Sequence, residues 1–186
     1  GLSDYGIFNF TFNTINQSSL GAIEDYQDFT CAQSTNVNEG DFINVSINTG
    51  TTLSHYVKMY LDANNDGVFA VSEEIYNNYA YNIHQDAVQI PLVTAHNTPL
   101  RLRVIADRYT ITSTCSSSSN YSQIEDYSII VSPNTNPPVT DFTSDFTTIN
   151  TGSSVTYTSL ASGFPTSFLW NFPGGVPSSS TAASPT

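Results

Sequence analysis

The sequence predicts an all-β protein built around an antiparallel β-sandwich, and three observations lead to this fold class. Its apolar stretches are short, rich in Val, Ile, Phe, Tyr and Thr, and alternate with polar residues at a period of two. Turn-forming Asn, Asp and Gly residues separate these stretches. No segment has the 3.6-residue periodicity of an amphipathic helix. Two packed layers of antiparallel strands would bury one face of each stretch.

Six stretches alternate most clearly and are the predicted strands of the first domain. They are residues 8–12, 42–47, 56–61, 87–90, 100–104 and 127–131. The tetrapeptide Ile-Glu-Asp-Tyr occurs twice, at 23–26 and 124–127, and each copy leads into a predicted strand. We therefore expect two related strands within one domain.

A proline-rich linker, residues 133–138, divides the chain into domains 1–132 and 139–186. Its three prolines oppose strand pairing and favour extended backbone. The second domain has only three strand-like stretches, whereas a complete sandwich has about seven strands. We expect this domain to be partial, and because the chain begins at Gly1 rather than Met, we expect a piece of a longer protein.

The composition excludes two classes of partner. Acidic residues outnumber basic residues 16 to 4, which gives a net charge of -12. This charge argues against nucleic acid and against anionic membrane surfaces. No apolar run approaches the roughly 20 residues of a membrane-spanning helix, so we expect no membrane insertion.

The segment 62–73 fits the calcium-loop pattern D-x-[DN]-x-[DN]-G-x5-E at every position. Calcium takes six to eight oxygen ligands, and alternate side chains of a tight loop can supply them. The predicted ligands are Asp62, Asn64, Asp66, the Val68 carbonyl, and Glu73 or Glu74, between which the sequence does not choose. A predicted strand precedes the loop, so the flanking helices of a helical hand are missing. The alternative is an Asn-Asp-Gly hairpin turn that binds no ion.

No catalytic set is recognisable, and we expect no enzymatic activity from this region. The three histidines have no zinc-site spacing, and no G-x-S-x-G elbow occurs. The two Glu-Asp pairs are read as structural, because adjacent strand residues point to opposite faces. Tyr76, Tyr79 and Tyr81 are either half-buried strand aromatics or a sugar-stacking platform.

Arg101 and Arg103 lie two residues apart on one face of a predicted strand. Because basic residues are scarce, we expect both arginines to pair with carboxylates. Glu125 and Glu24 are the leading candidates, and Asp126 is the alternative to Glu125.

The order of motifs resembles the GEVED domain of Bacteroidetes secreted proteins over about residues 5–132. The residues that carry the resemblance are 56–69, Glu73-Glu74, Ile90-Pro91, 100–104, Cys115 and Ile124-Glu125-Asp126-Tyr127. Of the family's Gly-Glu-Val-Glu-Asp signature, the sequence retains only the Glu-Asp end. Residues 137–186, with Trp-Asn-Phe-Pro-Gly-Gly at 170–175, resemble the first half of a PKD domain, an immunoglobulin-like sandwich.

These resemblances imply a non-catalytic, calcium-binding accessory module of a secreted multidomain hydrolase, with a metallopeptidase as the expected parent. The module would serve stability, spacing or substrate contact. The alternative is a segment of a bacterial cell-surface adhesin or extracellular filament. The expected partners are other domains of the same polypeptide and a polysaccharide or protein substrate. In a secreted or cell-surface location, Cys31 and Cys115 are expected to form a disulfide, with two free thiols as the alternative.

Overall fold

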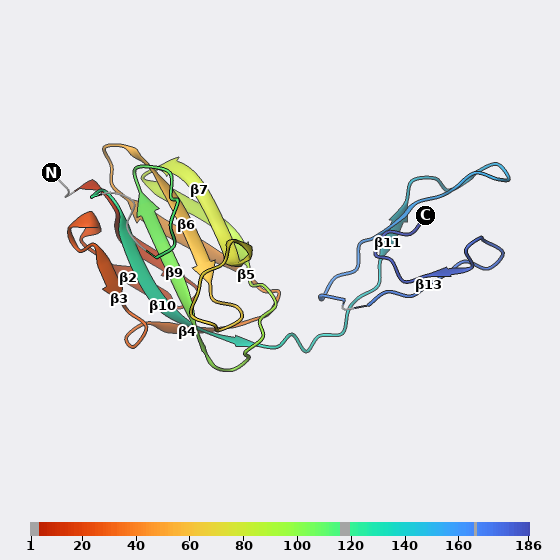
Figure 1. The fold of residues 1–186 in the computed structure, drawn as a ribbon, viewed down its shortest axis with the longest axis horizontal. Helices are drawn as coiled ribbons and strands as arrows, with labels where there is room; N and C mark the ends of the chain where they lie inside the picture. Colours follow the sequence, from red (N-terminus) through yellow and green to blue (C-terminus); the bar gives the residue numbers. More distant parts are fainter. Residues whose placement is uncertain (1–3, 116–119, 166) are drawn as a thin grey trace. The chain divides into compact units, whose positions relative to one another are not determined.

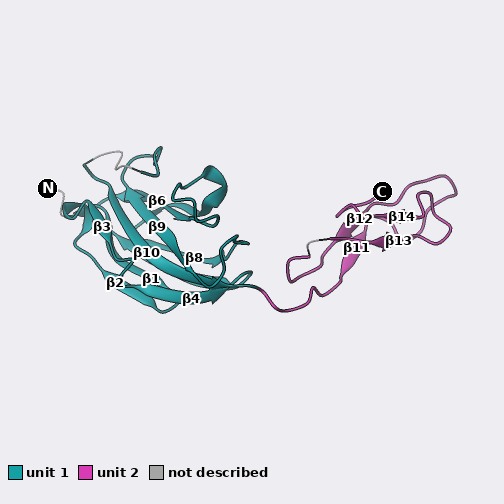
Figure 2. Ribbon diagram, turned by 60° about the horizontal axis from the view of Figure 1, so that its bottom comes forward, with its two compact units in different colours: residues 1–133 teal, residues 134–186 magenta. Residues whose placement is uncertain are grey.

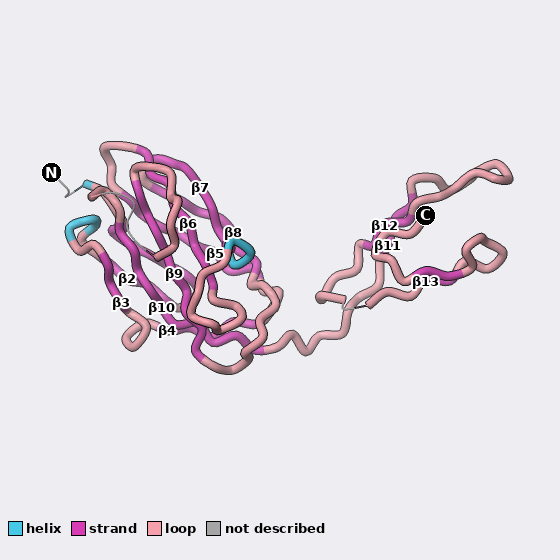
Figure 3. The backbone as a smooth tube through the Cα atoms, viewed as in Figure 1, coloured by secondary structure: helices cyan, strands magenta, loops and turns pink. Residues whose placement is uncertain are grey.

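The computed structural model describes residues 4–115, 120–165 and 167–186. The chain divides into two compact units, residues 1–133 and 134–186 (Figure 2). Both consist of strands joined by loops, and the helical segments are short 3₁₀ turns such as η2 (Gly21–Ile23) and η3 (Val71–Glu73) (Figure 3). The described residues include no helix that is long and apolar enough to span a membrane. The chain is therefore all-β, as the sequence predicts.

Unit 1 is a sandwich of two sheets (Figure 1). One sheet has four strands in the order β2-β1-β5-β8. The other has six: β3 and β4 both pair with β10, which is followed by β9, β6 and β7. The strands are β1 (Ile7–Phe12), β2 (Ile15–Ser18), β3 (Tyr26–Asp28), β4 (Ser34–Asn38), β5 (Phe42–Thr49), β6 (Ser54–Leu61), β7 (Glu74–Tyr81), β8 (Ile83–Gln89), β9 (Pro99–Asp107) and β10 (Gln123–Ser132).

The sandwich is antiparallel except at one edge, where β3 and β4 run parallel to β10. The two short strands follow one another along β10, and the Phe29 N–H between them donates to the Asp126 carbonyl at 2.8 Å. This arrangement brings the two Ile-Glu-Asp-Tyr copies together, because Tyr26 lies opposite Ile124. The Ile124 N–H also donates to the Asp25 carbonyl at 3.0 Å.

The main core lies between the two sheets and follows the predicted period of two. Leu100, Leu102 and Val104 of β9 are buried there at alternate positions. From the four-stranded sheet, Phe10 contacts Tyr127 of β10, with 4.6 Å between ring centroids. Alternation thus assigns one face of each strand to the core.

A second buried cluster covers the outer face of the six-stranded sheet. It consists of Tyr60, Phe69, Ile105, Ile111 and Ile124. Phe69 belongs to the loop after β6 and Ile111 to the loop after β9, so both loops lie over the sheet. Strands β9 and β10 are therefore buried on both faces, which is why most of their residues are inaccessible.

The structure contradicts the predicted disulfide. Cys31 and Cys115 are both exposed and unbonded. Cys31 lies in the turn between β3 and β4, and Cys115 in the loop between β9 and β10. A disulfide requires Cα atoms about 4.4–6.8 Å apart, a spacing that a count of cysteines cannot establish. The two-sheet core holds these elements together without a covalent link.

Unit 2 consists of two short hairpins. Strand β11 (Phe142–Ser144) pairs with β12 (Tyr157–Ser159), and β13 (Trp170–Asn171) pairs with β14 (Ser179–Ser180). Among its described residues only Pro185 is buried. An isolated two-stranded hairpin is marginally stable. The described residues of this unit leave most of their apolar side chains at least partly exposed.

Candidate functional site

The loop between β6 and η3 is closed by polar side chains that accept backbone hydrogen bonds. Asp62 follows the last residue of β6, and its carboxylate accepts the N–H groups of Asp66 at 3.1 Å and Gly67 at 3.0 Å. Asn64 Oδ1 also accepts the Asp66 N–H, at 2.9 Å. Asp66 Oδ1 accepts the N–H of Val68 at 2.8 Å. The predicted ligand positions therefore lie in one tight loop.

Glu73 and Glu74, which the sequence could not separate, point to different surroundings. The Glu73 carboxylate folds back onto the loop and accepts the N–H groups of Ala63 at 2.9 Å and Ala70 at 2.9 Å. Glu74 Oε2 instead accepts Lys58 Nζ at 2.8 Å and the Tyr60 hydroxyl at 2.9 Å. Glu73 ends η3 and Glu74 begins β7, so the two side chains belong to different elements. Glu73 therefore belongs to the loop and Glu74 to the sheet surface.

Glu73 and Glu74 also differ in whether a basic side chain lies beside the carboxylate. Burial alone would raise the pKa of Glu74, but hydrogen bonds from Lys58 and Tyr60 bring it below its ordinary value. Glu73 is 6% exposed and Asp62 is 3% exposed. The ion pairs found within residues 4–115, 120–165 and 167–186 join neither of these two carboxylates to a basic side chain. The loop thus concentrates buried negative charge without a protein cation.

The donor set of the loop suits a hard cation. A carboxylate oxygen that accepts one N–H keeps a second lone pair, and calcium prefers carboxylate, amide and carbonyl oxygens. In this conformation the described residues include no group of three or more His, Cys, Asp or Glu side chains placed to hold a metal ion. A calcium ion would therefore depend on Asn64 and the Val68 carbonyl as well as on the carboxylates. A cavity of about 390 Å³ adjoins the loop and is lined in part by Asp62, Asn65 and Arg101.

A buried ion pair lies beside this loop on the outer face of the six-stranded sheet. Arg103 Nε and Nη2 donate to Asp126 Oδ1 and Oδ2, both at 2.7 Å. Arg101 Nη1 lies 3.5 Å from Asp126 Oδ2. The Arg103 guanidinium also lies over the ring of Phe69, at 4.7 Å from its centroid. The ion pair therefore ties the loop after β6 to β9 and β10.

Both arginines pair with Asp126, the alternative to Glu125, so the leading candidates, Glu125 and Glu24, were wrong. Glu125 faces the core, where it accepts the Tyr127 hydroxyl at 2.6 Å and where burial raises its pKa to about 7. Glu24 accepts the Leu20 N–H at 2.6 Å. Asp126 stands directly opposite Arg103 in the β9–β10 register. Strand alternation excludes Glu125 from that face once the register is known.

The three tyrosines of β7 divide between the two faces of the sheet. Tyr76 is 6% exposed in the main core, and burial raises its pKa to about 12. Tyr79 and Tyr81 are each 58% exposed on the outer face. The description as buried strand aromatics therefore holds for Tyr76 alone.

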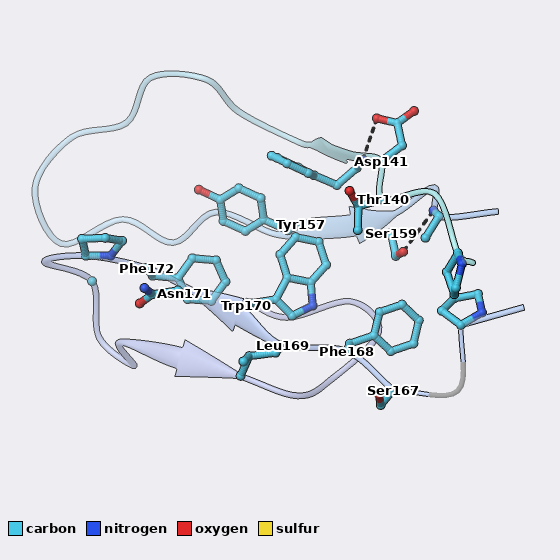
Figure 4. Close-up of a pocket in the computed structure, with 16 residues that line it drawn as sticks. Thr140, Asp141, Tyr157, Ser159, Ser167, Phe168, Leu169, Trp170, Asn171 and Phe172 are labelled. Atoms are coloured by element: carbon cyan, nitrogen blue, oxygen red, sulfur yellow. Dashed lines mark hydrogen bonds between the residues drawn. The ribbon is translucent and has the colours of Figure 1, made fainter. Parts of the chain in front are cut away.

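Unit 2 contains an open groove of about 750 Å³ that is lined by aromatic rings. Figure 4 shows Tyr157, Trp170 and Phe172 close together between the two hairpins. The ring centroids of Tyr157 and Phe172 are 5.2 Å apart. These rings pack on one another across the two hairpins, so aromatic packing explains the groove without a ligand.

Comparison with known proteins identifies one region of unit 1. No curated protein matches the chain. The solved structures similar to it include the titin domains Z1Z2 in complex with telethonin, at 11% identity and a TM-score of 0.31, over 88% of this chain and 68% of that chain. Because this TM-score is low, the comparison does not support a fold assignment. The fold assignment rests on the strand pairings described above. Residues 56–130, from β6 through most of β10, match the model of the GEVED domain. The resemblance to the GEVED domain is therefore confirmed over residues 56–130.

Proposed function

We propose that this chain is a non-catalytic, calcium-stabilised accessory region of a secreted multidomain hydrolase, with a metallopeptidase as the parent enzyme. Its role would be to space the parent's domains, to stabilise them and to contact substrate. The observation that carries the calcium role is the loop 62–73, in which Asp62 and Glu73 are buried without a basic partner among the described residues. Carboxylate oxygens gathered in one loop without a basic partner are the donor set that calcium prefers.

A second candidate function is a segment of a cell-surface adhesin or extracellular filament. Two compact β units joined in sequence by a proline-rich segment, 133–138, favour it, since repeated units of this kind build stalks. The flanking gene sequence separates the two candidates. A zinc-binding HExxH domain in the same reading frame supports the hydrolase, and a long array of similar sandwiches supports the adhesin.

The calcium role is tested by thermal unfolding of the whole chain in EDTA, in calcium and in magnesium. At a calcium concentration hundredfold above Kd, binding to the native state alone adds about 2.7 kcal/mol. For a chain of this size we expect calcium to raise Tm by about 5–10 °C, and magnesium to raise it less. Identical melting temperatures in all three solutions would leave the ion-free hairpin turn as the explanation of the loop.

The neighbouring glutamates supply a matched pair of variants. Glu73→Gln removes a charge from the loop, so it should abolish the calcium-dependent rise in Tm. Glu74→Gln removes the partner of Lys58 and should lower the Tm in EDTA, while the calcium-dependent rise remains. An equal loss of the calcium response in both variants would show that the effect does not depend on the loop.

A further inference from the structure

Three tyrosines form a row on the outer face of the six-stranded sheet, named here the tyrosine strip: the partly buried Tyr56 and the exposed Tyr79 and Tyr81. Tyr56 of β6 lies opposite Tyr79 of β7, and their ring centroids are 4.3 Å apart with an interplanar angle of 34°. Tyr81 follows two residues later on the same face, roughly 7 Å further along the strand. The strip therefore presents a nearly continuous aromatic surface.

Packing against the second buried cluster accounts for Tyr56, but not for the exposed rings of Tyr79 and Tyr81. The loops that carry Phe69 and Ile111 cover the outer face of the sheet at β9 and β10. At the edge strand β7, Tyr79 and Tyr81 remain 58% exposed. Strand β7 begins at Glu74, so both rings lie at its far end from the calcium loop, roughly 15–25 Å along the strand.

The charge of the chain restricts the ligand to a neutral one. Among the four basic side chains, Lys58 pairs with Glu74, and Arg101 and Arg103 pair with Asp126. The fourth, Arg108, lies over the ring of Tyr109 at 5.5 Å. Each cation is already engaged and the net charge is -12, so a polyanion would be repelled.

The size and chemistry of the strip favour a sugar chain over a protein. Three partly exposed rings offer at most a few hundred Å², whereas a stable protein interface needs about 800 Å² from each partner. A tyrosine combines an apolar ring face with a polar hydroxyl. A pyranose is complementary, because its C–H groups can stack on the ring while its hydroxyls bond to polar groups and water.

We propose that the tyrosine strip binds a neutral, extended polysaccharide by stacking sugar rings on Tyr56, Tyr79 and Tyr81. This inference names the substrate contact of the proposed function and rests on that function only for the extracellular setting. It does not involve the calcium loop, so sugar binding is expected in calcium and in EDTA alike.

The test is affinity electrophoresis of the whole chain in native gels. The probes are mixed-linkage β-glucan, xyloglucan or galactomannan, with polygalacturonate as the anionic comparison. At least one neutral polysaccharide should retard the chain, with or without calcium, and polygalacturonate should not. No retardation by any of the three neutral polysaccharides, or stronger retardation by polygalacturonate, would overturn the proposal.

Variants locate the binding surface. The double change Tyr79→Ala and Tyr81→Ala should weaken retardation at least tenfold, whereas Tyr79→Phe and Tyr81→Phe keep the rings and should retain it within about threefold. Phe42→Ala is the matched control, because Phe42 is an exposed ring, 67% accessible, on the other sheet. Unchanged retardation in the double alanine variant would exclude the strip. A change in sedimentation from dimer to monomer in that variant would assign the strip to a protein contact instead.

Failure of the two proposals can be told apart. If the calcium response is absent but the double alanine variant alone loses retardation, the sugar surface stands and the calcium role falls. If Tm responds to calcium but no neutral polysaccharide retards the chain, the calcium role stands and the sugar-binding proposal fails. Melting curves of each variant check that it is folded, and the phenylalanine variants keep the test valid if the alanine variants are unstable.

Discussion

Arg103 and Asp126 form a two-point ion pair between β9 and β10, with both N–O distances at 2.7 Å. Asp126 is fully buried, and the Tyr26 hydroxyl also donates to it, at 2.9 Å. Arg103 Nη1 reaches the carbonyl of Thr114, at 2.6 Å, in the loop after β9. One ion pair therefore joins β3, β9, β10 and a covering loop.

The change Asp126→Asn should lower the free energy of unfolding by about 3–5 kcal/mol, because it leaves the Arg103 charge buried without its partner. Arg101→Ala should cost less than about 1 kcal/mol, since the Arg101 side chain is 47% exposed and its contact with Asp126 is 3.5 Å long. Urea denaturation of both variants measures the difference. Equal losses would show that Arg103 and Asp126 do not act as a buried pair.

The pH dependence of stability should reflect two buried groups that act in opposite directions. Burial lowers the pKa of His84 from 6.5 to about 4, so the unfolded state binds protons first and stability falls as pH drops from 6.5. Burial raises the pKa of Glu125 from 4.5 to about 7, so the folded state binds protons first and stability rises as pH drops from 7. Between pH 7.5 and 5 each effect amounts to about 2 kcal/mol.

The effects of His84 and Glu125 should therefore largely cancel in the wild type, and His55, whose pKa burial also lowers, should leave a modest net fall in stability between pH 7.5 and 5. Glu125→Gln should lose about 2 kcal/mol over this range, because only the histidine effect remains, and His84→Gln should gain a similar amount. Urea midpoints at the two pH values measure these changes. Parallel pH profiles of stability for the three proteins would show that Glu125 and His84 do not cause the two pH effects.

The two cysteines should behave as independent surface thiols. Both Cys31 and Cys115 are exposed and unbonded, so a thiol reagent should titrate two groups in the native, unreduced chain. Cys31→Ser and Cys115→Ser should each change stability by less than about 0.5 kcal/mol. A titration of denatured, unreduced protein that finds no free thiol would restore the disulfide.

The two units should unfold in separate transitions. Trp170 is the only tryptophan, so tryptophan fluorescence reports on unit 2, while far-UV circular dichroism is dominated by the ten strands of unit 1. Because unit 2 buries little of its described surface, its fluorescence transition should come at a lower urea concentration. Coincident transitions would show that the two units unfold cooperatively.

Alternation predicted six strands of unit 1, namely β1, β5, β6, β8, β9 and β10. The predicted strand 100–104 and the buried Leu100, Leu102 and Val104 agree because a period of two assigns alternate side chains to one face. The short strand β3 was predicted where the first Ile-Glu-Asp-Tyr copy ends, whereas β4 was missed. Strand β4 holds five residues, and its parallel pairing with β10 depends on a neighbour about a hundred residues away.

The sequence by itself determined the all-β class, the core-facing residues of the main strands and the position of the candidate calcium loop, since these depend on local spacing. Only the tertiary structure decided that Asp126 rather than Glu125 meets Arg103, that Glu73 rather than Glu74 closes the loop, and that the cysteines stay apart. Each of these depends on strand register or on the path of a loop over the sheet. A shift of one residue in register would turn every side chain of a strand to the opposite face, and local spacing does not specify that choice between strands.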